Sequence, residues 1–240
     1  MRYVIFGNGR VGASIGAWLR HLGHRATTVA RAEAAAQAPP VLAAIAEADV
    51  VAAAIPDGAI AAWRRAFAPA LDGKRAIHFS GALLVDGLYS YHPLYSFPRT
   101  PLPPEAMNRI AFARQEGAPP LREIIPGAPN PEFAVADRDR AYYHALAVLS
   151  GNFAAYLWNE TAKGLAGRLG LKPEEVLAGY LEGVVARFAE SPFDSLTGPV
   201  ARRDRASAEA NLAALAGEPR LEALYRAFLA SAWPDFGGPE

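Results

Sequence analysis

The sequence has no cysteine among its 240 residues. This absence excludes disulfide bonds, thiolate nucleophiles and metal sites that use cysteine. We assign no residue to a metal site. The composition fits a reducing compartment, and we expect the protein to be cytoplasmic.

The sequence also lacks an excess of charge of either sign, with 24 basic and 24 acidic residues. A formal net charge of zero gives no long-range attraction toward nucleic acid or an anionic membrane. We therefore expect neither as a partner, and we expect a small-molecule substrate instead.

Long apolar runs are missing as well. The most apolar region, residues 41–63, is interrupted by Glu47, Asp49, Pro56 and Asp57. It falls short of the roughly 20 uninterrupted apolar residues that span a membrane. The N-terminal apolar run gives way to glycines after five residues, so we expect no signal peptide. Hydrophobic residues make up 52 % of the chain, which is enough for a sizeable buried core.

What the first part of the chain does contain is an alternation of short β-branched runs with segments of helical periodicity. This alternation is typical of parallel βαβ units and predicts an α/β domain of the Rossmann type. We expect strands at 2–6, 26–30, 50–55, 75–79 and 88–91, and helices at 11–22, 32–38, 41–48 and 59–67.

The composition then changes twice. Nine prolines lie between Pro98 and Pro131, where we expect loop with edge strands at 109–113 and 133–136. After Asp137, which we expect to cap a helix, only helical patterns remain. We therefore place a dinucleotide-binding domain at 1–136 and an all-α domain at 137–240. Its helices are expected at about 137–169, from Pro173, at 204–216 and at 221–233.

Three glycines follow the first strand in the segment GNGRVG, residues 7–12. Gly7 permits a tight turn, Gly9 lets a diphosphate approach the backbone, and Gly12 permits close packing of helix on strand. The helix N-terminus adds free amides and partial positive charge. The pattern predicts dinucleotide binding, although an ordinary glycine turn gives the same spacing. We assign the whole segment to the cofactor site: Gly7, Asn8, Gly9, Arg10, Val11 and Gly12.

The residue after the second strand selects the cofactor. A carboxylate about 20 residues after the glycines binds the ribose of NAD. This chain has Arg31 there, 19 residues after Gly12, and no acid before Glu33. Since an arginine suits a 2′-phosphate, we expect NADP(H) in preference to NAD(H). The alternative is that Arg31 only begins a solvated helix.

Later strand ends are expected to reach the same crevice, because ligands bind at the carboxyl ends of parallel strands. Ile55, Pro56 and Asp57 end the third strand, and Ser80 and Gly81 follow the fourth. We assign these five residues to the cofactor site. Residues 56–58 are also compatible with a simple turn.

His92 follows the fifth strand, in the segment YHPLYSF at 91–97. An imidazole titrates near neutrality and can move a proton during hydride transfer. We expect His92 to be catalytic and the hydroxyl of Ser80 to fix its tautomer. The alternative is a histidine bonded inside the turn before Pro93. We interpret His78, which lies within a strand, as structural.

Five motifs in order make the chain resemble a family of uncharacterised Rossmann-like proteins. That family joins an NADP-binding half to a helical domain of unknown function. It belongs to the wider group of pyrroline-5-carboxylate reductase, ketopantoate reductase, 6-phosphogluconate dehydrogenase and prephenate dehydrogenase. The motifs are GNGRVG, HFSGAL, YHPLYSF, YYHALAVLSGNF and SLTGPVARRD.

Two partial likenesses imply functional roles. YHPLYSF is similar to the His-Pro segment of prephenate dehydrogenases, which implies that His92 accepts a substrate proton with help from Ser80. LSGNFAAYLWNETAKGLAGRLGL is similar to the pyrroline-5-carboxylate reductase helix that passes the nicotinamide and builds the dimer. This likeness places Ser150, Gly151 and Asn152 at the active-site end and implies a homodimer.

The chain departs from this group at one position. Hydroxyacid dehydrogenases of the group carry a lysine one helical turn from the asparagine, whereas this chain has Val148 there. One turn earlier is His144, which shares a helix face with Asn152. Either His144 replaces the lysine or the family does not perform this chemistry. Asn152 is also compatible with a packing amide at a subunit interface.

The sequence thus predicts an NADP(H)-dependent oxidoreductase for a small keto acid, hydroxy acid or cyclic imine. We expect His92, Ser80, His144 and Asn152 to be its catalytic residues. The alternative is a protein that binds NADP(H) as a sensor or scaffold without turnover, because fold alone does not give function. The missing lysine supports this alternative.

Overall fold

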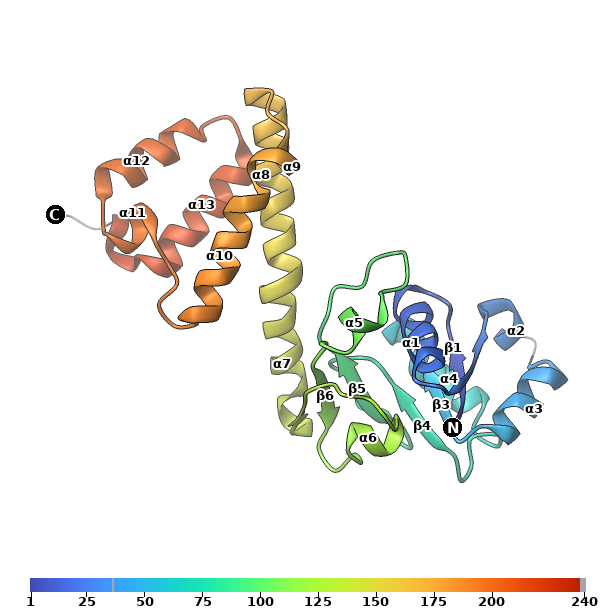
Figure 1. Ribbon diagram of the computed structural model, residues 1–240. Helices are drawn as coiled ribbons and strands as arrows, with labels where there is room; N and C mark the ends of the chain where they lie inside the picture. Colours follow the sequence, from blue (N-terminus) through green and yellow to red (C-terminus); the bar gives the residue numbers. More distant parts are fainter. Residues whose placement is uncertain (36, 238–240) are drawn as a thin grey trace. The chain divides into compact units, whose positions relative to one another are not determined.

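The computed structural model describes residues 1–35 and 37–237, and the chain divides into two compact units between Asn152 and Phe153. In the described part of the first unit, one seven-stranded sheet has the order β2-β1-β3-β4-β5-β6-β7 (Figure 1). The strands are β1 (Arg2–Phe6), β2 (Arg25–Val29), β3 (Val50–Ala53), β4 (Arg75–His78), β5 (Tyr89–Pro93), β6 (Phe112–Gln115) and β7 (Glu132–Val135).

Strands β1 to β5 are all parallel, whereas β6 runs antiparallel to β5, and β7 is parallel to β6. The chain moves from β1 to β2 on one side and then returns to β3 on the other side of β1. This reversal is the switch point at which doubly wound sheets bind ligands. The register pairs Phe6 with both Val29 and Ala53, so these three strands end at the same level. The predicted α/β Rossmann-type fold is confirmed.

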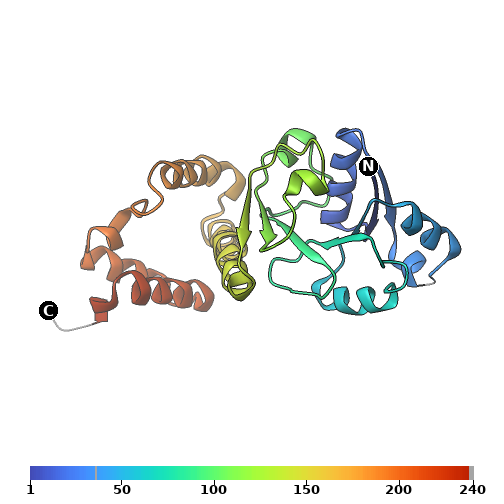
Figure 2. The same ribbon diagram turned by 90° about the horizontal axis from the view of Figure 1, so that it is seen from below.

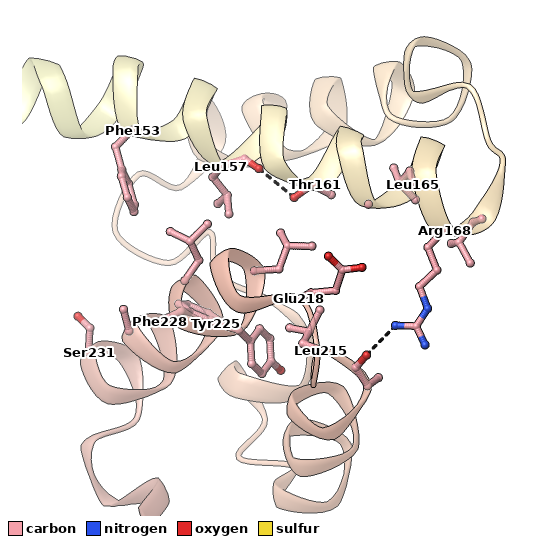
Figure 3. A pocket seen from close by; sticks show the side chains of 16 residues that line it. Phe153, Leu157, Thr161, Leu165, Arg168, Leu215, Glu218, Tyr225, Phe228 and Ser231 are labelled. Atoms are coloured by element: carbon pink, nitrogen blue, oxygen red, sulfur yellow. Dashed lines mark hydrogen bonds between the residues drawn. The ribbon is translucent and has the colours of Figure 1, made fainter.

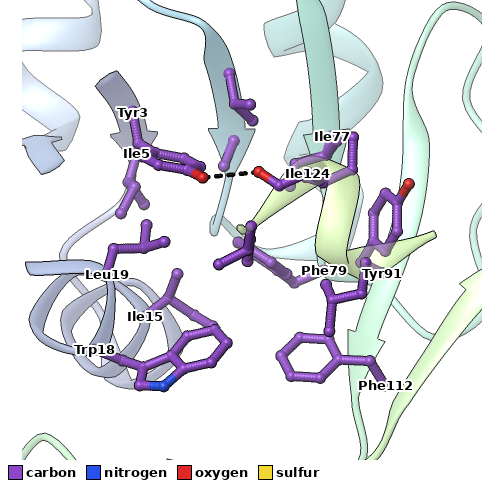
Figure 4. Close-up of a cluster of buried hydrophobic side chains, with 14 of the residues drawn as sticks. Tyr3, Ile5, Ile15, Trp18, Leu19, Ile77, Phe79, Tyr91, Phe112 and Ile124 are labelled. Carbon is purple, nitrogen blue, oxygen red and sulfur yellow. Dashed lines mark hydrogen bonds between the residues drawn. The ribbon is translucent and has the colours of Figure 1, made fainter. Parts of the chain in front are cut away.

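Two layers of helices enclose the sheet, and they appear on opposite sides of it in Figure 2. On one face, α1 (Arg10–His21), α5 (Pro104–Met107) and α6 (Leu121–Ile124) pack against alternate strand residues such as Ile5 and Ile77. Figure 4 shows this core, in which the Tyr3 hydroxyl donates to the Ile124 carbonyl at 2.7 Å. On the other face lie α3 (Pro39–Glu47) and α4 (Asp57–Ala66). The remaining helices of this unit are α2 (Arg31–Ala35), η1 (Asp137–Asp139) and α7 (Arg140–Ala147).

The second unit is helical in all its described secondary structure. A π-helical turn, η2 (Val148–Phe153), lies where the two units divide. The small core of the second unit contains Val200, Ala208, Leu229 and Trp233. The helices are α8 (Ala154–Leu169), α9 (Pro173–Val176), α10 (Ala178–Glu190), α11 (Gly198–Ala201), α12 (Arg205–Ala214), α13 (Pro219–Ala232) and η3 (Pro234–Gly237). In the part of the chain that the structure covers, no helix combines the length and apolarity needed to cross a membrane.

Three details differ from the sequence expectations. The proline-rich region contains the short helices α5 and α6, which begin after prolines and are too short to show a period. Asp137 is not a helix cap, since it lies inside η1 and accepts a bond from Gln115 at 3.3 Å. The units divide at Asn152 instead of residue 136, because α7 contributes to the packing of the first unit.

Candidate functional site

The glycine segment forms a tight, closely packed turn from β1 into α1. Gly7 has φ +105°, which favours glycine, and its amide donates to Val29 at 3.0 Å. A Cβ on Gly12 would lie 2.0 Å from the Gly7 carbonyl oxygen. These two glycines therefore hold the turn in a shape that side chains do not permit.

Gly9 has a different surrounding. Among the described atoms, none lies within 4 Å of where its Cβ would be. Gly9 is also the N-cap of α1, and glycine has no side chain that could cap the helix. The first amides of this 12-residue helix are thus open to a ligand. An open backbone beside a helix N-terminus fits the pyrophosphate of a dinucleotide.

Arg31 begins α2 at the end of β2, and its side chain is exposed. The carboxylate of Glu33 accepts a hydrogen bond from the Ala30 amide at 2.7 Å. The nearest acid is therefore engaged in starting the helix, while the Arg31 side chain is exposed to solvent. This arrangement agrees with a site for a 2′-phosphate.

The end of β3 lies directly beside the glycine turn. The Ala54 amide donates to Phe6 at 2.8 Å, and Ala54 and Ile55 contact the backbone region of Gly7. Pro56 and Asp57 then lead into α4. These residues lie at the carboxyl edge of the sheet, as predicted.

Among the described residues, Ser80 makes no hydrogen bond to His92, so its predicted role in fixing the His92 tautomer gains no support. The Ser80 hydroxyl donates to Asp57 at 2.7 Å and accepts from the Leu83 amide at 3.2 Å. It therefore links the ends of β3 and β4. Nδ1 of His92 is 2.8 Å from the hydroxyl of Tyr143 on α7, so Tyr143 fills the position expected for Ser80.

His92 and His144 lie edge to face, with ring centroids 5.8 Å apart. Gly81 packs against both rings, since a Cβ there would lie 2.5 Å from Cδ2 of His144 and 3.3 Å from Cδ2 of His92. Both histidines line a cavity of about 280 Å³. The other lining residues are Leu94, Tyr95, Ser96, Ala147, Val148, Ser150, Gly151 and Asn152.

The environment keeps His92 neutral near pH 7. Burial, followed by the charges of His144 and Arg140, lowers the pKa of His92 to about 4, and Asp57 opposes this shift. Burial and Arg140 likewise lower the pKa of His78 to about 4. His78 accepts a bond from the Ser80 amide at 3.2 Å and is fully buried, in agreement with a structural role.

Sequence reasoning therefore found His92, His144 and Asn152, which one cavity brings together, but it missed Tyr143 and Arg140. Tyr143 is adjacent to His144, and aromatic neighbours of a histidine are common in cores. Arg140 lies in a run of charges that is typical of a solvated helix start. The i, i+4 argument for Asn152 also assumed an α-helix throughout, whereas Val148–Phe153 is π-helical.

Comparisons with known proteins show a family and a fold for the chain. Residues 111–232, about half of the chain, match the family described as Domain of unknown function (DUF2520). No curated protein sequence matches the chain.

Several solved structures share the fold over nearly the whole chain. A candidate NADP oxidoreductase from Bacteroides fragilis is similar with a TM-score of 0.73 at 18 % identity, covering 96 % of this chain and 97 % of that one. A Streptomyces aurantiacus imine reductase has a TM-score of 0.65 at 16 % identity, with coverage of 97 % and 93 %. A Plasmodium falciparum pyrroline carboxylate reductase with NADP bound has a TM-score of 0.59 at 10 % identity, with coverage of 98 % and 97 %.

Proposed function

The chain belongs to the DUF2520 family, and from that premise we propose that it is an NADP(H)-dependent oxidoreductase. Its substrate is a small keto acid, hydroxy acid or cyclic imine. The observation that carries this proposal is the pairing of two sites on one unit. An open glycine turn at β1 fits a dinucleotide, and a cavity with two histidines lies at the end of β5.

The cofactor supplies or accepts a hydride when it is bound, and the protein supplies proton handling and orientation. We assign Tyr143 as the donor to Nδ1 of His92, which leaves the imidazole proton on Nε2. His92 then hydrogen-bonds the reacting oxygen or nitrogen of the substrate and relays a proton between it and solvent. His144 and Asn152 contact the substrate, while Ser80 holds Asp57 at the cofactor edge.

The names of the similar proteins support this choice of substrates. One is an imine reductase and another a pyrroline carboxylate reductase, so the fold accommodates reduction of carbon–nitrogen double bonds. The cavity of about 280 Å³ suits a small molecule.

The second candidate function is a sensor or scaffold that binds NADP(H) without turnover. Two observations favour it: the lining residues described for the cavity include no lysine, and the pKa of His92 is far below neutrality. Steady NADPH oxidation with a panel of keto acids and cyclic imines supports the oxidoreductase. Calorimetric binding of NADPH without turnover across the panel supports the sensor, and no heat with either coenzyme contradicts both.

The preference for NADP(H) is tested with Arg31→Ser. We expect the dissociation constant for NADPH to rise about tenfold, because a charged hydrogen-bond partner of the 2′-phosphate is lost. Affinity for NADH, which has no such phosphate, stays unchanged. Arg25→Ser is the matched control, since it removes another exposed arginine, at the opposite end of β2. Equal losses for both coenzymes would contradict the assignment.

We also propose that the protein is a homodimer that forms through the helical unit. That unit has a small core and a cavity of about 870 Å³ between α8 and α13, lined mainly by apolar side chains (Figure 3). Phe153, directly before α8, and Leu157 on α8 point into it, as does Phe228 on α13, and all three are partly exposed. A second copy would cover this apolar surface and the exposed side chains beside it.

Light scattering at micromolar concentration is expected to give twice the mass of the chain. Leu157→Glu is expected to yield monomer, because it places a charge on a contact surface that is mainly apolar. Leu42→Glu is the control, as Leu42 is exposed to a similar extent, 40 % against 38 %, but lies on α3 in the other unit. A wild-type monomer would overturn the proposal.

A further inference from the structure

Arg140 is an unusual residue for its position in the sequence. It belongs to the charged run Asp137–Arg140, yet its side chain is fully buried. None of the ion pairs found among the described residues includes it. Because arginine stays protonated even when burial lowers its pKa, a full positive charge lies inside this unit. A buried charge is costly and calls for a functional explanation.

The guanidinium is only partly satisfied. Its Nη2 donates to the Ser80 carbonyl at 3.2 Å and to the Ser90 hydroxyl. Within the described residues, Nε and Nη1 have no hydrogen-bond partner. Arg140 therefore joins α7 to the ends of β4 and β5, but its charge is not neutralised there.

The charge lies close to the histidine pair. The Ser80 carbonyl that Arg140 binds immediately precedes Gly81, and Gly81 packs against the rings of His92 and His144. One peptide unit thus separates the guanidinium contact from the residue that touches both imidazoles. Asp57 on α4 and Asp137 on η1 are the acidic groups that act on this cluster, whereas His78 on β4 is buried and Tyr143 on α7 is uncharged.

We infer that Arg140 is a positioning residue whose unneutralised charge selects the charge of the substrate group beside His92. It favours a carboxylate, or a carbonyl oxygen that becomes negative during reduction, and it disfavours a preformed iminium cation. This inference rests on the proposed function and narrows its substrate class to carbonyl compounds and their acids. Through Arg140, α7 also influences the site without contacting the substrate.

The charge effect is tested without turnover by following the His92 ring signals by NMR against pH. In Arg140→Gln, the pKa of His92 is expected to rise by about one unit, because a nearby positive charge is removed. Arg140→Lys retains the charge and is expected to restore the low value. Arg138→Gln is the matched control, since Arg138 is two residues away and its side chain is 85 % exposed. An unchanged pKa in Arg140→Gln would overturn the inference.

Ser90→Ala separates the hydrogen bonding of Arg140 from its charge. It also replaces Arg140→Gln as the test if that variant does not fold. This variant removes one partner of the guanidinium but keeps the charge, so the pKa of His92 is expected to stay low. A rise equal to that expected for Arg140→Gln would contradict a charge effect.

Two probes of similar size and opposite charge test the selection itself. Propanoate is expected to shift the His92 and His144 signals of the wild-type protein, and propylammonium is expected to leave them unchanged. Arg140→Gln is expected to lose this preference. Equal responses to both probes would overturn the inference. Because none of these readouts needs a coenzyme, they remain decisive if the oxidoreductase proposal fails.

Discussion

Gly12→Ala is expected to abolish measurable NADPH binding and to lower the stability of the protein. The new Cβ would lie 2.0 Å from the Gly7 carbonyl oxygen, a backbone atom that cannot rotate away. The start of α1 must move off β1, and the amides at its N-terminus lose their alignment. Overpacking of this kind costs about 1–3 kcal/mol. Calorimetry with NADPH and thermal unfolding measure the two effects.

Gly9→Ala separates binding from folding. No described atom lies near the new methyl group, so the unfolding temperature is expected to stay within error. NADPH affinity is still expected to fall at least tenfold, because the methyl group occupies the space beside the helix amides. Gly58→Ala is the control, since it also has open surroundings but lies in the first turn of another helix, α4. Normal NADPH binding by Gly9→Ala would show that the dinucleotide does not bind at this turn.

His92→Gln is the second change with a large expected effect. We expect kcat to fall about 10²- to 10⁴-fold, the range that proton transfer by a side chain contributes. NADPH affinity is expected to stay unchanged, because the glycine turn is intact. Tyr143→Phe is expected to lower kcat less than His92→Gln does, since the imidazole remains but its Nδ1 partner is gone. His21→Gln, at the exposed end of α1, is the control.

The pH dependence gives this prediction a second readout. Because the pKa of His92 lies at about 4, the imidazole is neutral above that pH and becomes charged below it. Activity is therefore expected to be constant through pH 6 and to decline only as the pH falls toward 4. A decline centred near 6.5, the ordinary histidine value, would show that burial does not control this group. Equal turnover by His92→Gln and wild type would exclude His92 from the chemistry.

Local patterns explain why the turn geometry of the candidate cofactor site was predictable. The turn from β1 to α1 depends on neighbours in sequence, and Gly7 and Gly12 signal their geometry directly. The histidine half depends on contacts across the chain. Tyr143 is 51 residues from His92, and Arg140 is 60 residues from Ser80. No periodicity encodes such pairs, so the sequence assigned to Ser80 a contact with His92 that the structure gives to Tyr143.

The start of α2 has a consequence for how coenzyme preference can change. Glu33 stabilises the first turn of this helix through the Ala30 amide, so its carboxylate is committed to folding. Replacing Arg31 alone would leave no acid free to hold a ribose hydroxyl. A change of coenzyme preference to NAD therefore requires a new carboxylate at position 30, directly after β2. In the proposed site, folding therefore depends on Glu33 and coenzyme choice on Arg31, two residues away, so the two requirements do not compete for one side chain.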